Sequence, residues 1–158
     1  MSDDRAPDPL HVFRFDVQLW QTSIAPGGAS ARVDLGRAAF AECTGLDATM
    51  EPKVIREGGR NYGAVQRVGP VSFGTVVLKR GMTRSTHLWQ TFHTIAAGAC
   101  SVRLEVEIRL LDGEGRVAMS FHLENALPVK LKVADFNARA TEVGIEELHL
   151  AHEGLTRS

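Results

Sequence analysis

The most regular pattern in this 158-residue chain is an alternation of apolar and charged residues between positions 102 and 123. The apolar positions are Val102, Leu104, Val106, Ile108, Leu110, Val117, Met119, Phe121 and Leu123. Charged residues, including Arg103, Glu105, Glu107 and Arg109, stand between the first five. Successive side chains of a β-strand point to opposite faces, and the intervening sequence DGEG (residues 112–115) is typical of a hairpin turn. We therefore predict two long antiparallel strands with one apolar face and one face of mixed charge.

Shorter alternating stretches predict further strands. They cover residues 11–19, 31–40, 48–56, 76–79, 129–133 and 143–150. A break is expected at residues 125–128, which contain a proline. The apolar phase also changes across Glu146 and Glu147, which predicts a β-bulge there or a strand whose two halves face different neighbours.

One stretch, residues 83–97, has helical rather than strand periodicity. Its large apolar residues share one helical face, and they are Leu88, Trp89, Phe92 and Ile95. Thr83 or Ser85 can cap the start, and Gly98 can end the helix in a left-handed conformation. Trp89 is expected to be its largest buried side chain. A single helix between strands must bury its apolar face against the sheet, so we predict a mainly β fold. Its expected architecture is an antiparallel β-sandwich or barrel with one packed helix.

Composition limits the class of protein. The chain is 44% hydrophobic and 23% charged, which is ordinary for a globular domain, and its net charge of −1 gives no general attraction to nucleic acid or an anionic membrane. No apolar run approaches the roughly 20 residues that span a bilayer. Residues 1–9 are polar and acidic, so we expect a flexible arm there, a single domain over residues 10–155, and folding in the cytoplasm. Cys43 and Cys100 are too few for a disulfide scaffold and are expected to be reduced.

Residues that could perform chemistry do not form a recognisable site. Neither GxSxG nor a phosphate-binding GxxxxGK[ST] sequence occurs. His149 and His152 would point to opposite faces of a strand, so they make poor metal co-ligands. Glu146 and Glu147 are more simply read as a solvated strand edge. We therefore assign no catalytic, cofactor-binding or metal-binding residue and predict a protein that is not an enzyme and needs no cofactor.

Residues 57–69 form the longest stretch without periodicity, and they include Gly58 and Gly59. A loop of this length inside a compact domain is usually functional or ordered by a partner. A disordered surface loop is the alternative, and composition does not separate the two.

Six motifs in order along the chain carry a resemblance to a known family. They are FAECTGLD (40–47), VIREGGRN (54–61), VLKRGM (77–82), LLDGEG (110–115), NALPVK (125–130) and DFNARATEVGIEELHLAHEGL (135–155). The chain resembles the tail-tube proteins of contractile-tailed phages and of phage-derived contractile injection systems. The resemblance covers roughly residues 10–155.

The resemblance implies both fold and function. Members of this family form a small β-sandwich or barrel with one helix, and six copies make a ring. Stacked rings form a rigid tube inside a contractile sheath, and strands of all protomers join so that a polar face lines the lumen. Residues 57–69 would then reach toward a neighbouring protomer or ring.

These implications give the expected function, which is a structural subunit of an inner tube. The expected partners are further copies of the chain, sheath subunits, baseplate or tube-initiator proteins and lumenal cargo, with no nucleic-acid specificity and no membrane insertion. The expected location is the cytoplasm during assembly and a phage tail or injection particle afterwards. Two alternatives remain: a paralogue that initiates the tube at the baseplate, and a small-ligand or carbohydrate-binding β domain.

Overall fold

The computed structural model describes residues 14–23, 32–98 and 101–158. The expected N-terminal arm at residues 1–9 and Cys100 lie outside these ranges. The elements are β1 (Phe15–Ser23), β2 (Val33–Ala38), β3 (Glu42–Thr44), β4 (Ala48–Met50), β5 (Lys53–Ile55), β6 (Val65–Arg67), β7 (Val71–Phe73), β8 (Val76–Gly81), α1 (His87–Ala96), β9 (Val102–Leu111), β10 (Val117–Lys132), β11 (Ile145–Ala151) and β12 (Gly154–Arg157).

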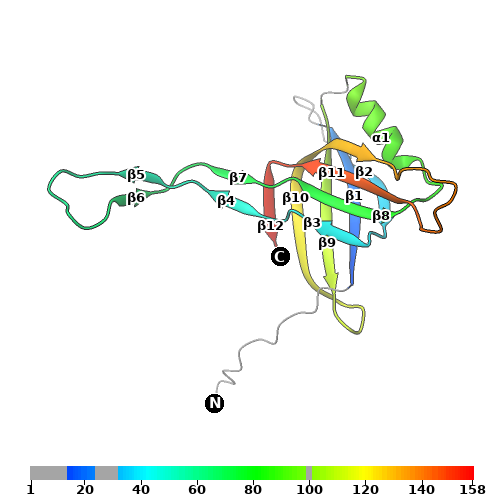
Figure 1. Ribbon diagram of the computed structural model, residues 1–158, viewed down its shortest axis with the longest axis horizontal. Coiled ribbons are helices and arrows are strands. Elements are labelled where there is room, and N and C mark those ends of the chain that lie inside the picture. Colours follow the sequence, from blue (N-terminus) through cyan, green and yellow to red (C-terminus); the bar gives the residue numbers. More distant parts are fainter. Residues whose placement is uncertain (1–13, 24–31, 99–100) are drawn as a thin grey trace, which may run out of the picture.

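Eight strands form one antiparallel sheet that folds over on itself. The order is β2-β1-β9-β10-β11-β8-β3, and β12 also pairs with β10. Strands β1, β9 and β10 make one layer, and β11, β8 and β3 cross over it as a second (Figure 1). The mainly β, antiparallel fold with one helix is therefore confirmed.

The core lies between these two layers. Its fully buried members come from both: Val17, Leu19, Val76, Leu78, Leu104, Val106, Leu123, Leu148 and Leu150. The alternation in the sequence thus places one face of each strand in the core, and the predicted strand at residues 102–110 matches β9.

The predicted hairpin between β9 and β10 is present, and its turn is fixed by Asp112. The carboxylate of Asp112 accepts hydrogen bonds from the backbone N–H groups of Glu114 and Arg116, both at 2.9 Å. The bond from Arg116 is the main cause that lowers the pKa of Asp112.

The expected break at residues 125–128 is wrong, because β10 continues through it to Lys132. The pairing register with β9 shifts between Leu123 and Ala126, and Asn125 has a positive φ of 49°. This irregularity bends the strand instead of ending it, so its first half pairs with β9 and β12 and its second half with β11. β10 is therefore the strand that joins the two layers.

The expected bulge and solvated edge at Glu146 and Glu147 are also wrong. β11 alternates without interruption, and Glu146 is buried on the same face as Leu148 and Leu150. Its carboxylate forms an ion pair with the guanidinium of Arg80 on β8, and this pair explains how a charged residue occupies a core position.

Helix α1 is shorter than expected, and its predicted apolar face is only partly covered. It starts at His87, with Thr86 rather than Thr83 or Ser85 at the N-cap position, and it buries Leu88 and Thr91. Trp89 is only half-buried, because the helix lies at the end of the two layers and not flat across one of them (Figure 1). Gly98 ends the helix with a φ of 107°, as predicted.

Candidate assembly surfaces

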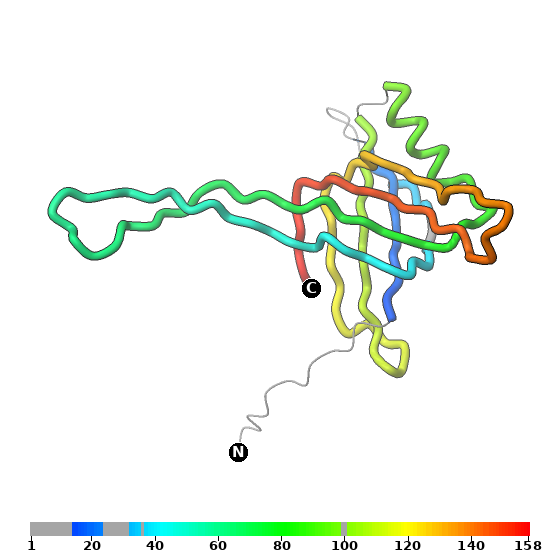
Figure 2. The backbone as a smooth tube through the Cα atoms, in the orientation of Figure 1, coloured from blue at the N-terminus to red at the C-terminus, as the bar shows by residue number. Residues whose placement is uncertain are grey.

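A two-stranded arm projects from one end of the second layer. Strand β4 pairs with β7 and β5 with β6, so residues 48–73, called the arm below, form a long hairpin (Figures 1 and 2). The predicted strand at residues 48–56 is thus present in two pieces. The expected irregular loop at residues 57–69 is partly wrong, since β6 lies within it. The irregular part is the arm tip, residues 56–64.

The arm has no hydrophobic core of its own. None of the residues from 41 to 75 is buried. Large apolar side chains on it face solvent, and Tyr62 is 93%, Val68 77% and Val54 56% exposed. An isolated two-stranded hairpin is marginally stable in water, so an arm of this kind gains stability when another surface covers it.

Close backbone contacts fix the arm where it leaves the two layers, which are together called the barrel below. Gly45 has a φ of 86°, and a Cβ atom there would overlap the carbonyl oxygen of Thr75. Within the arm, a Cβ on Gly69 would overlap the carbonyl oxygen of Glu51. Glycine is required at both positions because two backbone segments pass too closely there for a side chain.

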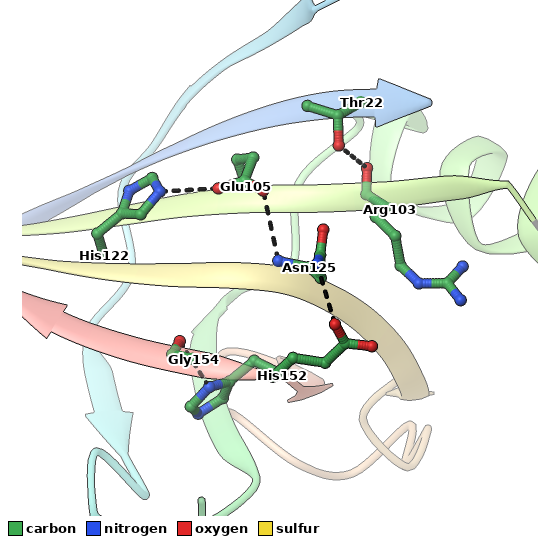
Figure 3. Close-up of polar contacts among 8 residues, drawn as sticks. Thr22, Arg103, Glu105, His122, Asn125, His152 and Gly154 are labelled. Atoms are coloured by element: carbon green, nitrogen blue, oxygen red, sulfur yellow. Dashed lines mark hydrogen bonds and ion pairs between the residues drawn. The ribbon is translucent and has the colours of Figure 1, made fainter. Parts of the chain in front are cut away.

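The face of the first layer that points away from the core is polar and largely paired with itself. Arg109 on β9 donates to both carboxylate oxygens of Asp16 on β1, at 2.8 and 3.1 Å. On the same face, the Nε2 atom of His122 lies 2.7 Å from Glu105, which also accepts from the backbone N–H of Asn125 (Figure 3). The predicted face of mixed charge is therefore present.

In the eight-stranded sheet, three strands have an unpaired edge within the described residues. β2 pairs only with β1, β3 only with β8, and β12 only with β10. Unpaired N–H and C=O groups on a strand edge are a ready template for another chain. The first layer thus has an open edge on each side, at β2 and at β12.

The histidines and carboxylates weighed in the sequence do not converge. His149 lies 3.1 Å from Glu147, and this hydrogen bond is the main cause that lowers the pKa of that carboxyl. His152 is directed elsewhere, with its Nδ1 atom 3.0 Å from the carbonyl oxygen of Gly154. In the described part of the chain, no three His, Cys, Asp or Glu side chains are grouped so that they could hold a metal ion.

One apolar cavity of about 410 Å³ opens between β3 and the β9–β10 hairpin. Its lining includes Phe15, Leu46, Ile108 and Phe121, and burial there raises the pKa of the Cys43 thiol to about 11. A ligand site usually adds several convergent polar groups to such a surface, whereas Glu42 is the charged residue that lines this one. The cavity gives little support to a ligand-binding function.

The buried Arg80–Glu146 pair was missed in the sequence although a signal was present. Arg80 follows Val76 and Leu78 in strict alternation, and Glu146 precedes Leu148 and Leu150 in the same way. Opposite charges at core-facing positions of two neighbouring strands indicate a buried ion pair.

A two-layered β fold with open sheet edges, a polar outer face and an arm without a core defines a class of protein: a subunit of a larger assembly. The chain belongs to the T4-like virus tail tube protein gp19 family, whose sequence model matches residues 11–156. It is a structural subunit of a tail or injection-system tube, and so part of a phage tail or injection particle. Within the described residues, no helix is long and apolar enough to cross a membrane.

Solved structures with the same fold come from contractile injection systems. A chain in the six-fold symmetrised baseplate of the anti-feeding prophage is 26% identical, with a TM-score of 0.79 over 97% of each chain. A chain in the PVC sheath–tube complex, an extracellular contractile injection system in its extended state, is 20% identical, with a TM-score of 0.77 over 95% of this chain and 91% of that one. An Hcp protein is more distant, at 10% identity and a TM-score of 0.51 over 90% of this chain and 98% of that one. A search of curated protein sequences gives no significant match.

Proposed function

We propose that residues 10–155 act as one tail-tube domain that forms rings of six copies, and that the rings stack into a rigid conduit. The observation that carries this proposal is the arm, which has no buried residue and exposes Tyr62, Val68 and Val54. An exposed hairpin of this kind gains stability when a neighbouring copy covers it. The six-fold symmetry of the related baseplate supports the ring size.

The open edges of the first layer suggest how a ring closes. The β2 edge of one copy can lie beside the β12 edge of the next, which extends the sheet through successive copies. The face that carries Asp16, Arg109, Glu105 and His122 then lines the conduit, where charged side chains stay in contact with water. Lining a water-filled conduit accounts for the polar face without catalysis. We therefore propose that the subunit is not an enzyme.

The proposed partners follow from the related structures, which contain tube, sheath, cap and baseplate components. We propose that the chain assembles in the cytoplasm on a baseplate, within a sheath, and that cargo occupies its lumen. The alternative role is a tube initiator at the baseplate, whereas the family match and the likeness to a sheath–tube complex support the tube subunit. A shaft subunit would continue to add rings on a baseplate, whereas an initiator would stop after one.

Deletion of residues 58–62 tests the role of the arm tip. The deletion removes no buried side chain, so the subunit should keep its circular dichroism spectrum and its cooperative unfolding. Ring stacking should be lost, which sedimentation velocity would detect as missing high-mass species. Normal tubes formed by the deletion variant would contradict the role proposed for the arm.

A further inference from the structure

A second exposed surface lies at the opposite end of the molecule from the arm. It consists of Met82 after β8, the segment 133–144 and Ile145 at the start of β11, and is called the acceptor end below. The arm leaves one end of the second layer and the 133–144 segment closes the other (Figure 2). Strands β8 and β11 run between them.

The acceptor end exposes apolar side chains on a fixed backbone. Phe136 is 86% and Val143 75% exposed. The backbone N–H of Met82 donates to the carbonyl oxygen of Gly144 at 2.9 Å, and the N–H of Ala140 donates to that of Asn137 at 3.0 Å. The segment is therefore held against the barrel while its aromatic side chain points into solvent, an arrangement typical of a contact surface.

The charges of the two surfaces are complementary. The arm carries four cationic side chains, Lys53, Arg56, Arg60 and Arg67, against the two carboxylates of Glu51 and Glu57. A hollow of about 320 Å³ at the acceptor end is lined by the carboxylates of Asp135, Glu142 and Glu147 and by the ammonium of Lys132. Arg139 adds a second cation to the same segment, so carboxylates outnumber cations there by three to two. Opposite charges around apolar centres steer two surfaces together and fix their register.

A chain cannot join its own two surfaces, because they lie at opposite ends of the same layer (Figure 1). At roughly 3.3 Å per strand residue, the arm extends about 40 Å, which is longer than the roughly 20 Å of β8. It can therefore cover the end of another copy. A contact between two different surfaces of identical chains is head-to-tail and produces rings or filaments, not closed pairs.

We propose that the acceptor end of one copy binds the arm tip of a neighbouring copy, with Phe136 packed against Tyr62 and Glu142 facing Arg60. The inference rests on the proposed tube function and adds to it the surface that receives the arm. Neither surface needs a buried side chain to be moved, so both can be altered in a folded subunit.

Cross-linking between two populations of the chain tests the contact. Both populations carry Cys43→Ala and Cys100→Ala; one adds Tyr62→Cys and the other Phe136→Cys. After co-assembly, a short bismaleimide should give about 10-fold more covalent dimer than with Val117→Cys as the partner, because assembly raises the local thiol concentration. Val117 is the control, since it is also exposed, at 51%, but follows the β9–β10 turn.

Charge reversal provides a second measurement that does not depend on the cysteines. Glu142→Arg alone should raise the concentration needed for assembly about 10-fold, and adding Arg60→Glu should restore it. Tubes that form without the Tyr62–Phe136 cross-link and without sensitivity to Glu142→Arg would overturn this inference and leave the tube function intact. If the parent chain forms neither rings nor tubes, alone or on a baseplate, the proposed function fails, and the inference fails with it.

Discussion

At the scale of single residues, the ion pair between Arg80 and Glu146 fixes how β8 and β11 face the core. The two side chains are 10% and 6% exposed, and the guanidinium of Arg80 also lies 5.6 Å from the ring centre of Phe40. Burial of a charge is costly unless a partner of opposite charge stays with it. The pair is therefore sensitive to the loss of one member and less sensitive to the loss of both.

We predict that Glu146→Gln lowers the free energy of unfolding by about 3 kcal/mol, because it leaves the Arg80 guanidinium buried without a counter-charge. The double substitution Arg80→Met with Glu146→Leu should stay within about 1 kcal/mol of the parent, since apolar side chains suit the same positions. Urea unfolding below the assembly concentration measures both. If the double variant loses as much free energy of unfolding as Glu146→Gln, the ion pair contributes net stability and the prediction is wrong.

At the scale of elements, α1 closes one end of the barrel through a narrow contact. Leu88 belongs to the core cluster, whereas Trp89 remains half in solvent, with its ring 6.0 Å from that of His93. Periodicity alone predicted that Trp89 is the largest buried side chain of the helix. The pattern identifies the apolar side of a helix, but the position of the helix at the end of the layers decides how much of that side is covered.

The two helix residues should therefore differ in their effect on stability. Leu88→Ala should lower the free energy of unfolding by about 2–4 kcal/mol, as truncation of a buried leucine does. Trp89→Ala should cost under about 2 kcal/mol in the free subunit, because much of its surface stays in water. Thermal or urea unfolding of the two variants gives the comparison, and a larger loss for Trp89→Ala would contradict the placement of α1.

Alternation in the sequence predicts the strands that bury one face. It fails where pairing with another strand or a buried charge departs from that alternation. β9 and the first half of β10 follow from alternation, and the turn follows from DGEG. The β5–β6 pairing was missed because nearly all its side chains are exposed, so no period marks it. The bend at Asn125 depends on pairing with distant strands, which local sequence does not encode.

The candidate assembly surface was predicted only in part. Residues 57–69 stood out by their glycines and lack of periodicity, which left a functional segment and a disordered loop equally open. Phe136 gave no signal, since isolated apolar residues in a loop also occur in cores, and Val143 was assigned to the strand expected at residues 143–150. Their importance emerges from their exposure and from their place opposite the arm.

At the scale of the whole molecule, the chain is a rigid barrel with a projecting arm at one end and an exposed apolar surface at the other. Its core is sufficient for the barrel but not for the arm, where none of the residues from 48 to 73 is buried. We propose that other copies of the chain supply the stability that the arm lacks.

The most direct test of the tube function is negative-stain electron microscopy of the purified protein, concentrated alone and mixed with baseplates. We predict rings with six-fold symmetry and an open lumen, stacked into tubes of uniform width. The same grid with the variant that lacks residues 58–62 should show single subunits or unstacked rings. Dispersed monomers of the parent chain at high concentration, with no growth on baseplates, would contradict the account.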